Sequence, residues 1–120
     1  MRRSTLIPLA AAAALVAAGA AAQENYASWP PLQSEFPSTG GGGIVIKGYN
    51  PVIANGKCVT DFTAVEPNGT TYDNTVEYDA VPAEGGTLCT NGRWRARDGS
   101  ASGTTPFRMF FKDGRFYAQP

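Results

Sequence analysis

The chain of 120 residues contains no histidine, and this absence removes several kinds of active site. A Ser-His-Asp triad and a Cys-His nucleophile both need an imidazole as general base. Imidazole is also a common metal ligand. We therefore expect no histidine-dependent catalysis, no bound metal and no cofactor.

The sequence also lacks helical periodicity after residue 22. No stretch of ten or more residues there repeats apolar side chains at the i, i+3, i+4 spacing of a helix. The four glycines at 40–43 consequently do not lie between a strand and a helix, as the glycines of a phosphate-binding loop do. This glycine run is better interpreted as a flexible joint.

The first 22 residues contain two basic residues and no acidic one. Arg2 and Arg3 precede an apolar run at 6–21, and the small residues 20–22 form a cleavage pattern, so residues 1–22 are typical of a secretory signal peptide. The run is rich in alanine and falls short of the roughly 20 strongly apolar residues that a permanent anchor needs. We expect a secreted or periplasmic protein with no integral membrane segment after cleavage.

Cleavage after Ala22 also changes the charge balance. It removes Arg2 and Arg3, two of the ten basic residues, and none of the ten acidic residues, which leaves eight basic groups against ten acidic ones. Binding to nucleic acid requires a basic face. We therefore expect no nucleic-acid partner.

Cysteine is limited to Cys58 and Cys89, and both remain after cleavage. An even number of cysteines in a small exported chain predicts a disulfide bond. The alternative is a metal site, but two widely spaced cysteines without histidine make a poor zinc ligand set. The sequence favours a disulfide between Cys58 and Cys89.

Residues 23–43 are predicted to be a flexible tail and linker. The segment contains three prolines, ends in the glycine run and shows neither helical nor strand periodicity. Its aromatic residues Tyr26, Trp29 and Phe36 are unusual for a disordered spacer. They suggest that the tail docks, either on the domain itself or on a partner.

Residues 44–120 read as short strands separated by turns. Asp113-Gly114 and Asn91-Gly92 each predict a tight hairpin, because both residues tolerate positive φ. The expected strands cover residues 44–46, 57–65, 70–81, 87–90, 93–97, 106–112 and 115–119. The prediction is a disulfide-closed, all-β domain of about six or seven short, largely antiparallel strands, arranged as a small sandwich or a partly open barrel.

Arginines alternate with apolar residues around Trp94. In an extended strand, Arg93, Arg95 and Arg97 share one face, while Trp94 and Ala96 share the other. The arginines are either a solvent-facing row that pairs with acidic neighbours or a binding strip. As a strip, they would bind an anionic glycan or a protein partner, including an enzyme that the module inhibits.

Two residues of the next predicted strand complete the candidate site. Arg108 would extend the cationic strip, and Phe110 would supply an exposed aromatic ring beside it. The alternative for the aromatic surface is that the tail around Trp29 folds over it.

The sequence therefore predicts an exported, non-catalytic binding module. A second hypothesis is a small carboxylate-dependent hydrolase that uses Glu77 and Asp79, which lie two apart on one strand face. A third hypothesis is a structural component of the cell envelope.

Overall fold

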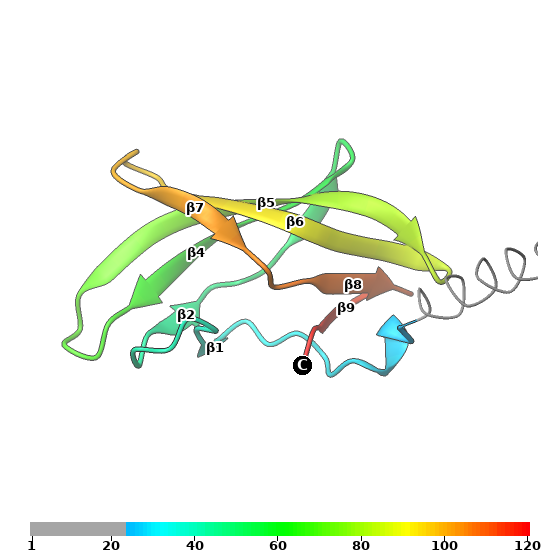
Figure 1. Ribbon diagram of the computed structural model, residues 1–120, viewed down its shortest axis with the longest axis horizontal. Helices are drawn as coiled ribbons and strands as arrows, with labels where there is room; N and C mark the ends of the chain where they lie inside the picture. Colours follow the sequence, from blue (N-terminus) through cyan, green and yellow to red (C-terminus); the bar gives the residue numbers. More distant parts are fainter. Residues whose placement is uncertain (1–23) are drawn as a thin grey trace, which may run out of the picture.

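The computed structural model describes residues 24–120, which form one antiparallel β-sheet curled into a half-barrel (Figure 1). The predicted signal peptide at 1–22 and Gln23 lie outside the described residues. The all-β prediction is confirmed, and of the two predicted architectures the partly open barrel is the closer. Within residues 24–120, no helix has the length and hydrophobicity needed to cross a bilayer.

The described residues form one 3-10 turn and nine strands. They are η1 (Tyr26–Ser28), β1 (Phe36–Pro37), β2 (Val45–Lys47), β3 (Val52–Ala54), β4 (Lys57–Val65), β5 (Thr71–Ala83), β6 (Gly86–Ala96), β7 (Ser102–Thr105), β8 (Met109–Lys112) and β9 (Arg115–Ala118). Seven strands follow one another in the order β1-β2-β4-β5-β6-β8-β9, while β3 pairs with β4 and β7 pairs with β6. The long strands β5 and β6 form the arch in Figure 1.

The hairpin predicted at Asn91-Gly92 is wrong, because both residues lie inside the continuous strand β6. Their place in the register is a β-bulge: Glu77 faces Arg93 and Asp79 faces Thr90, so two residues of β6 stand opposite one residue of β5. Asn91 has a φ of 56°, the left-handed conformation that the hairpin would also have required. The Asn-Gly pair thus bends a strand here instead of ending one.

The bulge decides which face of β6 carries Cys89 and Trp94. The two residues are five apart, so a regular strand would place them on opposite faces of the sheet. The extra residue of the bulge restores the alternation, and both side chains pack against the same core. One bulge therefore brings the cysteine and the tryptophan to the concave side together.

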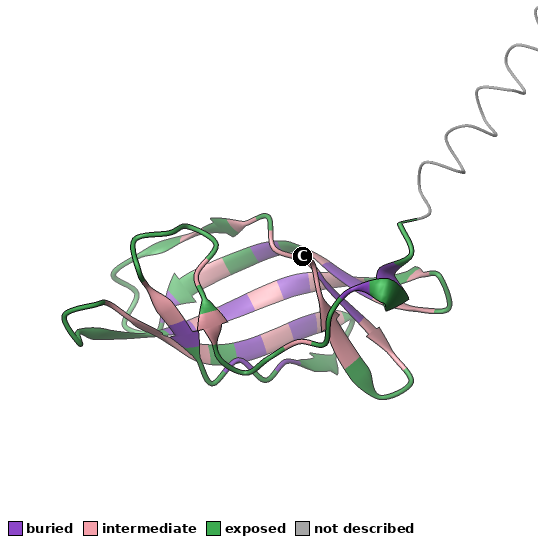
Figure 2. Ribbon diagram, turned by 90° about the horizontal axis from the view of Figure 1, so that it is seen from below, coloured by how far each residue is buried: buried purple, intermediate pink, exposed green. Residues whose placement is uncertain are grey.

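The predicted flexible tail is docked from Glu24 onward and closes the curl. The Leu32 amide donates to the Phe116 carbonyl of β9, and the Ala118 amide donates to the Pro30 carbonyl. A few residues later, Phe36 and Pro37 pair with β2 at the other end of the sheet. One short segment thus bonds to both edges and crosses in front of the concave face (Figure 2). Docking on the domain itself is the alternative that the structure supports.

Strand β8 is buried on both faces, because its neighbours Met109 and Phe110 enter different clusters. Met109 packs in the main core with Cys58, Cys89, Val76 and others. Phe110 packs on the opposite face against η1, in a cluster of buried residues that comprises Tyr26, Trp29, Leu88 and Phe110. The N-terminal segment therefore supplies a second small core.

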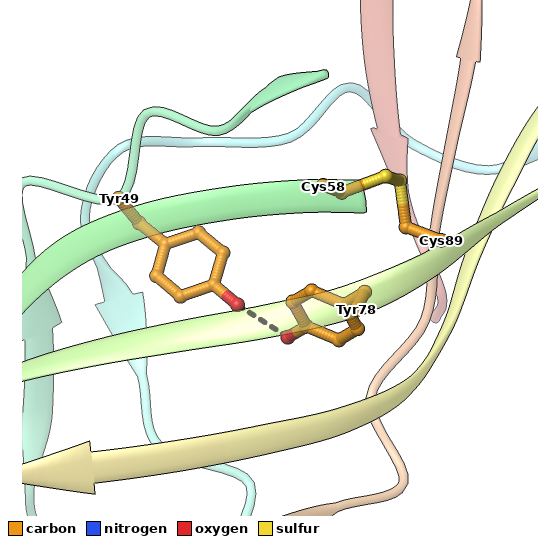
Figure 3. The surroundings of a disulfide bond; sticks show 4 residues. All are labelled: Tyr49, Cys58, Tyr78 and Cys89. Carbon is orange, nitrogen blue, oxygen red and sulfur yellow. Dashed lines mark hydrogen bonds between the residues drawn. A yellow bond between two sulfur atoms is a disulfide. The ribbon is translucent and has the colours of Figure 1, made fainter. Parts of the chain in front are cut away.

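Cys58 and Cys89 lie at disulfide-bonding distance, with their Sγ atoms 2.11 Å apart (Figure 3). Both are fully buried beside Tyr78, and they link β4 to β6 across β5. A cysteine pair at this distance is compatible with an oxidising extracellular compartment.

Candidate functional site

The concave side of the curled sheet lines a partly open cavity of about 550 Å³. Its floor includes a row across three neighbouring strands, in which Phe62 of β4, Asn74 of β5 and Ala96 of β6 stand in register. The alternation of strand residues points all three to the inside, while their chain neighbours point outward. The small Ala96 side chain leaves room beside Asn74.

Four aromatic rings form one wall of this cavity. Phe36 stacks on Phe107 with ring centroids 5.7 Å apart, and the Tyr49 ring lies 5.2 Å from that of Phe36 and 5.4 Å from that of Phe62. Trp94, inward-facing as predicted, also belongs to the lining, as do Tyr72 and Tyr78. Large, stiff rings with apolar faces are typical of small-molecule sites.

The lining contains no charged side chain. Its polar groups are hydroxyl groups, backbone, the Trp94 indole N–H and the Asn74 amide. The loop at 38–40 and the segment at 100–107 supply some of the hydroxyl groups. A charged ligand placed here would lose its hydration without gaining an opposite charge, which is costly. The cavity is therefore suited to uncharged molecules.

The hydroxyl groups of Tyr49 and Tyr78 form a hydrogen bond inside the core (Figure 3). Burial raises the pKa of Tyr78 to about 12, although the hydrogen bond to Tyr49 opposes this shift. Burial also raises the pKa of Tyr49, and the proximity of Tyr78 adds to that increase. Both phenols consequently stay neutral over the physiological pH range.

Arg93 and Arg95 of β6, and Arg97 just after the strand, are exposed as the alternation predicted, but Arg93 and Arg97 pair with acidic residues. The Arg93 Nη2 atom lies 3.3 Å from Glu77 Oε2 and 3.2 Å from Asp79 Oδ1. Arg97 lies 3.4 Å from Asp73 and 4.0 Å from Asp61. Among the described residues, Arg95 has no ion-pair partner. The row is thus a mixed surface of both charges.

Arg108 does not extend this row, because it is bound to the N-terminal segment. Its guanidinium group donates to both carboxylate oxygens of Glu24, at 2.8 and 3.2 Å, and lies over the rings of Tyr26 and Trp29. Glu24 raises the pKa of Arg108, and the arginine lowers the pKa of Glu24 in return. The residue serves to hold the tail.

Phe110 is fully buried, so the prediction of an exposed ring at this position is wrong. The Tyr26 ring of η1 covers it at a centroid distance of 5.3 Å. The alternative, that the tail folds over this surface, is the arrangement found. The sequence-predicted residues of the strip are therefore not brought together as one site.

Glu77 and Asp79 lie on the exposed face next to Lys57 and Arg93, and neither residue lines the cavity. Hydrogen bonds from Lys57, Asn91 and Arg93 lower the pKa of Asp79 to about 2. A carboxylate that stays ionised to so low a pH is a poor general acid. This geometry gives the hydrolase hypothesis no support.

Within the part of the chain that the structure describes, no three His, Cys, Asp or Glu residues are grouped to hold a metal ion. Comparison with known proteins finds no matching family model, no matching curated protein and no matching solved structure. Any functional conclusion therefore depends on the geometry of the chain itself.

Proposed function

We propose that the protein is a small, exported, non-catalytic module that binds an uncharged, largely apolar small molecule inside its curled sheet. The observation behind this proposal is the cavity of about 550 Å³ lined by aromatic side chains and by no charged one. This volume lies within the roughly 300–1,000 Å³ of typical small-molecule sites. Export is part of the proposal and is supported by the cleavage pattern after residue 22 and the buried cysteine pair.

The rings around the cavity also favour binding over catalysis. Phe36, Phe62, Phe107 and Trp94 carry no group that can take up or release a proton near neutral pH. Burial raises the pKa of both Tyr49 and Tyr78, so these two phenols stay neutral near neutral pH. A site with apolar walls and few polar groups retains a ligand without reacting with it.

A fluorescence titration tests the proposal. N-phenylnaphthylamine is an uncharged dye that becomes brighter in apolar surroundings, and we expect it to bind saturably to the oxidised protein. The variant Ala64→Trp places an indole in the cavity and should weaken dye binding at least tenfold, since the space is finite. Ala54→Trp is the matched control, because Ala54 lies exposed on β3 outside the cavity.

Three results are decisive for this titration. Saturable binding that Ala64→Trp abolishes and Ala54→Trp leaves intact supports the proposal. Equal binding by both variants would place the dye elsewhere, and absence of binding to the wild-type protein would refute the proposed function. Circular dichroism melting of each variant establishes that it is folded under the titration conditions.

A further inference from the structure

Two polar side chains are buried among the described residues, Thr60 and Asn74, each with 7 % of its surface exposed. The hydrogen bonds of Thr60 are complete within the chain. Its hydroxyl accepts from the Asn50 amide at 3.1 Å and donates to the Asp61 carbonyl at 2.7 Å. Thr60 is also absent from the cavity lining, so it has a purely structural role.

Asn74 differs from Thr60 on both counts. Its side chain lines the cavity, and its one hydrogen bond is long: the Nδ2 atom lies 3.4 Å from the carbonyl oxygen of Tyr72 on its own strand. No described residue donates a hydrogen bond to its Oδ1 atom. An amide has one acceptor oxygen and two N–H donors, so most of this capacity is unused.

A buried amide whose oxygen has no partner in the protein is unfavourable, because that oxygen is removed from bulk water without gaining a hydrogen bond from the chain. An apolar residue at this inner position would fit the pattern of the strand, where Val76 and Tyr78 follow on the same face. The free oxygen and the free N–H of Asn74 together present an acceptor beside a donor. The complementary group has a donor beside an acceptor, as in a carboxamide or a lactam.

The side chains around Asn74 also indicate which kind of ligand would carry the carboxamide or lactam. Phe62 stands directly opposite Asn74 on β4, and Trp94 stands opposite Val76, the next inward residue of β5. Cross-strand and diagonal neighbours at these positions lie about 5–8 Å away, within reach of one bound ring. Ala96, on the third strand, leaves the space open.

We propose that Asn74 is the specificity-determining residue of the cavity, and that it recognises an uncharged ring compound through a carboxamide or lactam edge. This inference rests on the proposed function and deepens it. The ring lies against Phe62 and Trp94, and its amide edge forms two hydrogen bonds with the Asn74 side chain.

Equilibrium dialysis with two probes of nearly equal shape tests the inference. Naphthalene-carboxamide carries the donor and the acceptor, whereas acetylnaphthalene carries the acceptor alone. We expect the wild-type protein to bind the carboxamide about tenfold more tightly, the value of one matched hydrogen bond in a buried site. In Asn74→Leu, the preference for the carboxamide should be lost or reversed, because its N–H groups would be buried without a partner.

Thr60→Val provides the matched control, because it also removes a buried polar group from the inner face. We expect it to lower stability while keeping the tenfold preference, since its bonds are internal. Asn74→Leu should melt at the same temperature as the wild-type protein or higher, because the only bond it removes within the described chain is the long one to the Tyr72 carbonyl.

The outcomes separate the inference from the proposed function. If both probes bind the wild-type protein with equal affinity, the inference is wrong and the binding function survives. A preference that persists in Asn74→Leu would also refute the role of Asn74. If neither probe binds, the inference fails, and the dye titration decides separately whether the proposed function fails as well. The comparison within the wild-type protein remains decisive even if a variant does not fold.

Discussion

Replacing Gly92 with alanine is predicted to destabilise the protein, because the bulge leaves no space for a methyl group. A Cβ atom at this position would lie 2.5 Å from the Thr105 methyl carbon and 2.6 Å from Cε2 of the Tyr78 ring. Carbon atoms prefer separations of about 3.5–4.0 Å. The strand, Tyr78 or Thr105 must therefore shift by about 1 Å, and Tyr78 is fixed by its hydrogen bond to Tyr49.

The expected decrease in the free energy of unfolding is the difference between two opposing effects. Overpacking a dense core costs about 1–3 kcal/mol, whereas replacing glycine restricts the unfolded chain and contributes roughly 0.4–1 kcal/mol of stability. We expect Gly92→Ala to lose about 1–2 kcal/mol, which corresponds to a decrease in Tm of roughly 5–15 °C for a domain of this size.

Thermal melting and urea titration of the oxidised protein measure this effect. The second variant, Thr105→Ser with Gly92→Ala, removes the methyl group of the closest contact and should recover part of the loss. Gly40→Ala is the matched control, because only Ser38 Oγ, at 3.7 Å, lies near its Cβ position. Wild-type stability in Gly92→Ala, or no recovery in the double variant, would refute the packing described at the bulge.

Three other predictions concern the cross-link, the buried phenols and the docked tail. The double variant Cys58→Ala with Cys89→Ala removes a cross-link between residues 31 apart in sequence, so its free energy of unfolding should fall by about 3–4 kcal/mol in a denaturant titration. An unchanged denaturation midpoint would contradict the disulfide bond. Burial raises the pKa of Tyr78 to about 12, above the value near 10 expected in the unfolded chain, so its contribution to folding stability is complete below pH 10 and is lost as the pH rises toward 12. Absorbance at alkaline pH should show this phenol ionising only when the protein unfolds. Ionisation of Tyr78 in the folded protein near pH 10 would disprove its burial. Glu84→Gln replaces the carboxylate that accepts hydrogen bonds from the backbone amides of residues 24–26 with a neutral group, so hydrogen exchange of those amides should accelerate. Glu35→Gln, at an exposed position, is the control and should leave their exchange unchanged.

Much of the strand content could be predicted from local patterns. The alternation in residues 57–65 gave both bounds of β4, and Asp113-Gly114 gave the β8–β9 hairpin, where both residues have positive φ. The separation of Trp94 from the exposed arginines on either side of it also followed from alternation alone. These features depend on residues that are neighbours in sequence.

The bulge could not be separated from a hairpin by local sequence. An Asn-Gly pair satisfies both geometries, because each needs a residue at positive φ. What decides between them is the length of the partner strand: β5 continues for 13 residues and pairs with β6 on both sides of Asn91. That information lies in the pairing of the two strands.

The cavity was missed for a related reason. Phe36 and Phe107 form one wall of it, yet they are far apart in sequence and meet only when the N-terminal segment closes the curl. One local signal did exist: Asn74, Val76 and Tyr78 alternate along one strand, so their side chains share a face, and a polar amide lies on an otherwise apolar face. An inward polar residue indicates a binding site when, unlike Thr60, its hydrogen bonds are not completed within the chain.

The most direct test of the account is an NMR measurement of contacts between protein and probe. Nuclear Overhauser effects from bound naphthalene-carboxamide should reach the rings of Phe62, Trp94 and Phe107, which line the concave cavity. Contacts confined to Arg93, Arg95 and the outer face of the sheet would contradict the conclusion that the interior of the curl is the binding site.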